Sequence, residues 1–194
     1  MANKLIELTR KKTPLDLEFL SRESLAWYKN EIKNLSSPAD LAKDIVKLRR
    51  KTPFEVGGLY HFFYDPLHKR KLPYYDMFPL VIPLSKGSDG FTGLNLHYLP
   101  PMRRATFLDK LIDFDFETNK DEQKRIRVTY DILTATKTLK EFRPCMKYYL
   151  NSQIKSRIVP IKTSEWETAV FLPTAIFVGE KESKVHAESI KRIR

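Results

Sequence analysis

The stretch GGLYHFFYDPLHKRKLPYYDMFPLVIPLSKGSDGFTGLNLHYL, residues 57–99, is unlike the rest of this 194-residue chain because aromatic and branched side chains crowd into short runs. Those runs are 58–64, 78–84 and 91–98. Their composition is typical of β-strands, and the Asp-Pro and Gly-rich pieces between them are typical of turns. The stretch therefore predicts an α+β protein whose centre is a small SH3-like antiparallel β-barrel or a bent sheet.

Two prolines fall in the second run, at Pro79 and Pro83. Because proline cannot donate a ladder hydrogen bond, this run is predicted to be an edge strand. Closing a barrel requires further strands, for which Met1–Leu8 and Ile158–Ile161 are the candidates.

Helical patterns flank the predicted sheet on both sides. Residues 1–53 are predicted to form a helical arm, with Ser37-Pro38 as its strongest helix start and Pro53 as its end. Residues 54–194 are predicted to be one compact unit, the β-core packed with C-terminal helices. Those helices are expected from Pro101, within 119–133, from Arg143 to about Ile154, around Trp166 and from Ser183 to Ile193.

The charge of the chain predicts a polyanionic partner. Lys and Arg number 35 against 24 Asp and Glu, which gives a net charge of +11. The excess lies in residues 1–53 and 121–194, whereas residues 54–120 are neutral overall. No apolar run approaches the length of a membrane span, and no signal-peptide core is expected at the N-terminus. A single cysteine excludes an internal disulfide.

Basic clusters with neighbouring tyrosines are the candidate nucleic-acid contacts, since phosphates attract cations and exposed bases stack on aromatic rings. The loop Lys69-Arg70-Lys71 is the best of them because a loop between strands is exposed. The full candidate set is Lys69, Arg70, Lys71, Tyr74, Tyr75, Arg103, Arg104, Lys124, Arg125, Arg127, Lys140 and Lys147. The alternatives are a solvated basic surface without a ligand and, for the tyrosines, rings packed in the core.

Catalytic and metal-binding patterns are weak by comparison. Asp65 and Asp76, or the alternating carboxylates of 113–117, could bind the Mg²⁺ of a metal-dependent nuclease. A turn at Asp65 and a polar loop at 113–117 explain these residues more simply. His61 and His97 on aromatic strands are expected to satisfy hydrogen bonds in a core. Cys145 is expected to be a small core residue. No cofactor, metal site or catalytic residue is therefore predicted.

Three pieces of the chain carry a resemblance to a known family. They are residues 61–111, the later FRPCMKYYLNSQIKSRIVPI (142–161) and EWETAVFLPTAIFVGEKESKVHAESIKR (165–192), with GLNLHYLP (93–100) the most specific part. Together they resemble small virion-associated proteins of T4-like tailed bacteriophages, the DNA end protectors. The resemblance covers about residues 55–194 and carries no assigned functional residues.

The resemblance implies a non-enzymatic protein that binds the ends of packaged linear double-stranded DNA and shields them from host exonuclease. Its implied partners are DNA termini and other virion proteins, with no membrane. Its implied locations are the virion and the host cytoplasm during assembly and after DNA ejection.

Two other functions remain open from the residues. A structural neck, tail or baseplate component of the virion would use the aromatic patch for protein contacts. A Mg²⁺-dependent nuclease would use the carboxylates named above.

Overall fold

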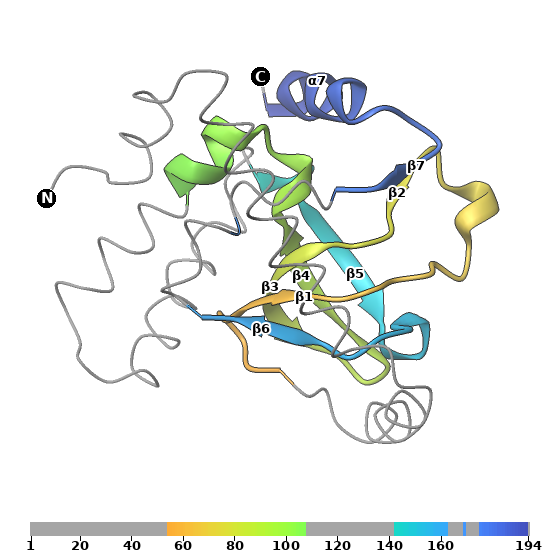
Figure 1. The fold of residues 1–194 in the computed structure, drawn as a ribbon. Coiled ribbons are helices and arrows are strands. Elements are labelled where there is room, and N and C mark those ends of the chain that lie inside the picture. The colour runs from red at the N-terminus through yellow and green to blue at the C-terminus, as the bar shows by residue number, and fades with distance from the viewer. Residues whose placement is uncertain (1–53, 108–141, 163–168, 170–174, 194) are drawn as a thin grey trace, which may run out of the picture.

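The computed structural model describes residues 54–107, 142–162, 169 and 175–193 of the chain. Within them lie a five-stranded antiparallel sheet, a two-stranded antiparallel sheet, a helical segment at 101–107 and the C-terminal helix α7 (Glu182–Ile193) (Figure 1). The architecture is the mixed helix and sheet that the sequence predicts, and the helices expected from Pro101 and Ser183 are present. The predicted arm at 1–53 and the predicted helix within 119–133 lie outside the described residues, as does most of the helix predicted around Trp166.

The larger sheet is open. Its strands are β1 (Leu59–His61), β3 (Leu80–Lys86), β4 (Gly90–Asn95), β5 (Met146–Leu150) and β6 (Val159–Ile161), in the order β5-β4-β3-β1-β6. The outer strands β5 and β6 do not pair with each other in the described part of the chain. The SH3-like barrel is therefore not confirmed.

The position of β3 corrects one prediction. The run with two prolines is the middle strand of the sheet and not an edge strand. Pro79 precedes the strand, and Pro83 lies where the register against β4 shifts, between Pro83 and Ser85. A bulge of this kind tolerates a residue without an N–H group, so the prolines do not prevent pairing on both sides.

The segment after Arg143 corrects a second prediction, the helix from Arg143 to about Ile154. Residues 146–150 form β5, followed by the 3-10 turn η4 (Asn151–Gln153), and not the predicted helix. β5 pairs along its whole length with β4, from Gly90↔Leu150 to Leu94↔Met146. This long-range pairing overrides a local pattern that fits a helix equally well. By contrast, the strand proposed at Ile158–Ile161 is confirmed as β6.

The smaller sheet was not predicted. It pairs β2 (Tyr75–Asp76) with β7 (Phe177–Val178), two strands about a hundred residues apart in the sequence. Gly179 follows β7 with φ +97°, and a Cβ there would lie 2.6 Å from the carbonyl oxygen of Pro73. Glycine is therefore required where β7 passes the residues that lead into β2.

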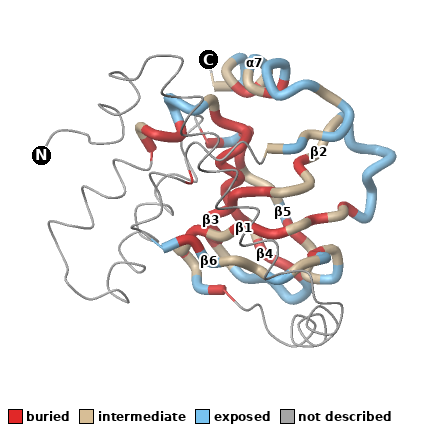
Figure 2. Tube along the Cα trace, in the orientation of Figure 1, coloured by how far each residue is buried: buried red, intermediate tan, exposed pale blue. Residues whose placement is uncertain are grey.

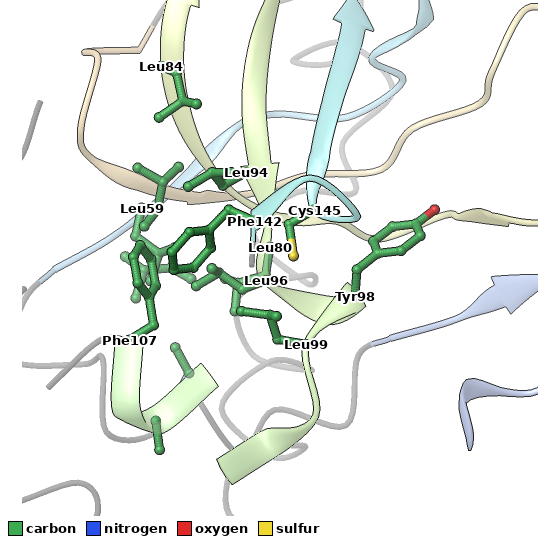
Figure 3. Packing of buried hydrophobic residues seen from close by; sticks show 14 of the residues in the cluster. Leu59, Leu80, Leu84, Leu94, Leu96, Tyr98, Leu99, Phe107, Phe142 and Cys145 are labelled. Carbon is green, nitrogen blue, oxygen red and sulfur yellow. The ribbon is translucent and has the colours of Figure 1, made fainter. Parts of the chain in front are cut away.

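Two apolar clusters cover the two faces of the larger sheet. Successive side chains of β3 point to opposite faces, so Leu80 and Ile82 join one cluster and Val81 joins the other. In the first cluster the rings of Phe107 and Phe142 meet at a centroid distance of 4.7 Å (Figure 3). Figure 2 shows the buried residues concentrated in this sheet, whereas residues 67–73 are exposed. No helix in the described ranges is long and apolar enough to cross a membrane.

The β4–β5 contact predicts the effect of a small substitution. In Gly90→Ala the new Cβ would lie 2.1 Å from the carbonyl oxygen of Tyr149, so the two strands must separate. We expect a loss of about 2 kcal/mol in the free energy of unfolding, measured by urea denaturation. Gly87→Ala is the matched control because its Cβ meets the end of the Tyr148 side chain, which can rotate away. Equal stabilities of the two variants would contradict this packing.

Candidate nucleic-acid interface

The loop between β1 and β2 presents the candidate cations to solvent. Its centre is the 3-10 turn η1 (Lys69–Lys71), and all three side chains are exposed. In Figure 1 this turn stands out from the body of the molecule. Lys69 Nζ lies 2.9 Å from Asp65 Oδ1, an exposed ion pair that restrains the base of the turn. Arg70 and Lys71 are the most prominent charges of the loop.

The two candidate tyrosines lie on opposite sides of the backbone. The Tyr74 ring packs against Tyr98 and Phe177, and its hydroxyl donates to Glu188 of α7 at 2.9 Å. This ring is part of the contact that holds α7. Tyr75 is half-buried and pairs with Val178 across the smaller sheet. Tyr75 is therefore the tyrosine that remains suitable for stacking on a base.

Arg103 and Arg104 differ in the same way. Arg103 is exposed at the start of the helix, whereas Arg104 is 2% exposed. The Arg104 guanidinium donates to the carbonyl oxygens of Leu96 and Leu99, and burial lowers its pKa to about 10, so it stays charged at neutral pH. The Arg104 guanidinium thus holds the turn that follows β4 in place and does not face solvent.

Lys147 is also partly withdrawn from solvent. Its Nζ lies 4.1 Å from the centre of the Tyr98 ring, and burial lowers its pKa to about 8. This cation–π contact supports β5 against η2 (Leu96–Tyr98). The remaining candidates, Lys124, Arg125, Arg127 and Lys140, lie outside the described residues.

A buried polar network connects the two sheets, and the sequence did not predict it. The carboxylate of Asp76 in β2 accepts three hydrogen bonds, from the Phe78 N–H (3.0 Å), Asn95 Nδ2 (3.0 Å) and His97 Nδ1 (2.7 Å). Both side chains of the Asp76–His97 pair are at most 1% exposed. The prediction that His97 satisfies hydrogen bonds in a core is confirmed, and its backbone carbonyl also accepts from His186 Nε2.

His61 borders this network. Its Nδ1 lies 3.0 Å from the carbonyl oxygen of Pro79, so Nδ1 carries the proton and donates it. Burial, followed by repulsion from His97, lowers the pKa of His61 to about 4. The ring is therefore neutral at physiological pH.

Comparison with known proteins adds the family. The profile of the family described as phage T4 terminal DNA protecting protein matches residues 9–192. The chain belongs to this family. No curated protein and no solved structure matches it.

Membership of the DNA-protecting family agrees with the resemblance to T4-like end protectors. It also directs attention to the exposed cations and Tyr75, because a protein that protects DNA termini must contact phosphates or base pairs.

The two described carboxylates of the nuclease alternative are already engaged. Asp65 pairs with exposed Lys69, and Asp76 is buried against His97, while 113–117 lie outside the described residues. No group of three or more His, Cys, Asp or Glu side chains within the described ranges is arranged to hold a metal ion. Cys145 is the buried core residue that the sequence predicts, and burial raises the pKa of its thiol to about 12.

The network predicts that Asp76 is essential for stability. Asp76→Ala would remove the acceptor of the Phe78 N–H and of the buried donors of Asn95 and His97, and we expect a loss of at least about 3 kcal/mol in unfolding free energy. Asp65→Ala is the control, because an exposed ion pair such as the one with Lys69 contributes little to stability. Urea denaturation measures both. A tolerated Asp76→Ala would show that the network does not hold the sheets together.

The lowered pKa of His61 predicts that the protein loses stability in acid. Between pH 6.5 and about 4 the unfolded chain binds a proton at His61 that the folded protein excludes. The free energy of unfolding therefore falls as the pH drops through this window. His61→Asn keeps a donor for the Pro79 carbonyl but does not titrate, so we expect its stability to fall less steeply over the same window. Identical pH slopes for variant and wild type would rule out His61 as the source.

Proposed function

We propose that this protein binds the ends of linear double-stranded DNA without cleaving them and shields them from host exonuclease. The observation that carries the proposal is membership, over residues 9–192, of the phage T4 terminal DNA protecting family. A protein that only covers a DNA end needs affinity for that end and no catalytic activity. The structure supports this role through exposed cations beside buried or ion-paired carboxylates.

Charge supplies the general attraction to DNA. The net charge of +11 and the projecting cations of η1 favour contact with phosphates, which releases counterions. We propose Lys69, Arg70, Lys71 and Arg103 as phosphate contacts and Tyr75 as a ring that stacks on a base. Arg104, Lys147 and Tyr74 are left out because their polar ends are used within the protein. Lys124, Arg125, Arg127 and Lys140 remain proposed contacts from charge alone.

This role sets where the protein acts. We propose that it is carried in the virion, among other virion proteins, and that it remains on the DNA end in the host cytoplasm after ejection. Exonuclease attack begins at a free terminus, so a protein bound there needs only to cover the last base pairs.

The direct test is an exonuclease challenge. We expect labelled linear duplex to resist a processive exonuclease when this protein is present, and closed circular DNA in excess to compete poorly. Lys69→Gln/Arg70→Gln/Lys71→Gln should weaken binding and reduce the slope of log K against log salt by about 2–3, close to 0.9 for each lost phosphate contact.

The other outcomes contradict the proposal in different ways. Equal competition by circular and linear DNA would indicate general coating. Absence of protection would favour the structural virion role. Cleavage that EDTA abolishes, without added exonuclease, would indicate the nuclease.

A further inference from the structure

The smaller sheet has an inner and an outer face. Asp76 and Phe177 are paired across β2 and β7 and both point inward, to the buried network and to Tyr98 respectively. Because side chains alternate along a strand, the next pair, Tyr75 and Val178, points outward. The ladder continues through the Met77 N–H, which donates to the carbonyl oxygen of Ile176 at 3.0 Å. Ile176 is two residues from Val178 and so lies on the same outer face.

This outer face is apolar and exposed. Ile176 is 48% exposed and Val178 36%, and Leu72, just before β2, is 42% exposed. These are three of only six large apolar side chains that are exposed in the described residues. Tyr75, Ile176 and Val178 together form the outer face of β2 and β7, here called the ribbon face, and Leu72 precedes it in the chain. An apolar surface of this kind marks an interaction site.

The cations of η1 border the ribbon face. Residues 69–71 lead directly into Leu72, three residues before the start of β2 at Tyr75. On the other side, Gly179 abuts the backbone of Pro73. Apolar side chains and three consecutive positive charges therefore occupy one edge of the molecule.

We propose that the ribbon face packs on the exposed face of the terminal base pair of duplex DNA, while the η1 cations contact the phosphates around it. A DNA end presents an apolar base-pair face ringed by negative charge, and no internal site presents one. Aliphatic and aromatic side chains both pack against base faces in known DNA contacts. This inference rests on the proposed function and adds the surface that distinguishes an end from internal DNA.

The test separates end affinity from general DNA affinity. Ile176→Thr/Val178→Thr keeps β-branched side chains on the strand but makes the ribbon face more polar. We expect its affinity for short linear duplex to fall about tenfold, with its affinity for closed circular DNA unchanged, because a stacking contact is lost and the phosphate contacts remain. Met102→Gln is the matched control, since Met102 is 44% exposed but belongs to the helix at 101–107 and not to the two strands.

Each other result has a defined meaning. A folded double variant that keeps its preference for linear DNA overturns the ribbon face while leaving end protection intact. A wild-type protein without any preference for linear DNA overturns end protection itself. Altered self-association, by sedimentation, with unchanged end affinity would make the ribbon face a protein interface and overturn the proposal.

A second variant tests the proposal if the two threonine substitutions disrupt folding. Val178→Phe enlarges the apolar face at an exposed position, and we expect a few-fold gain in affinity for linear duplex alone. A folded Val178→Phe that binds ends no more tightly than wild type also overturns the proposal.

Discussion

The carboxylate of Asp76 joins the two sheets of this protein. Asp76 belongs to β2 of the smaller sheet, whereas Asn95 ends β4 of the larger sheet and His97 lies in the turn that follows. Three hydrogen bonds converge on this one buried group, and a buried acceptor is far more costly to lose than an exposed one. The strands β2 and β7 are only two residues long and could not hold their position alone. Their placement depends on this contact and on α7, which the Tyr74–Glu188 and His186–His97 hydrogen bonds attach to the rest of the protein.

The fixed position of β2 and β7 determines which side chains face solvent at this edge of the molecule. With Asp76 and Phe177 turned inward, Tyr75 and Val178 must face outward, and the exposed η1 loop is carried to the same edge. Five basic side chains within the described residues thus fall into two groups. Arg104 and Lys147 stabilise the junction from within, while Lys69, Arg70 and Lys71 remain at the surface. If this edge recognises a DNA end as we propose, protection rests on its shape and charge and requires no catalytic centre.

The sequence predicted what local patterns encode. The apolar runs marked β1, β3 and β4, and helix α7 was evident from its periodicity. It did not reveal β5, whose Met-Lys-Tyr-Tyr-Leu pattern is a strand only because β4 pairs with it. Nor could it find the β2–β7 pair, since two-residue strands a hundred residues apart have no local signal. At the candidate site, Tyr74 and Tyr75 are identical in type, as are Arg103 and Arg104. Only the tertiary contacts show that Tyr74 and Arg104 are used internally.

The most direct measurement is the distance between the η1 loop and a DNA terminus in the complex. Cys145 is buried and its thiol has a raised pKa, so His68→Cys would be the reactive thiol among the described positions for a fluorescent donor. The acceptor would be placed either on the terminal nucleotide or at the centre of a linear duplex longer than the range of energy transfer. Binding of the η1 loop at a DNA end predicts strong energy transfer to the terminal acceptor and little to the central one. Equal transfer to both positions, or stronger transfer to the centre, would contradict it.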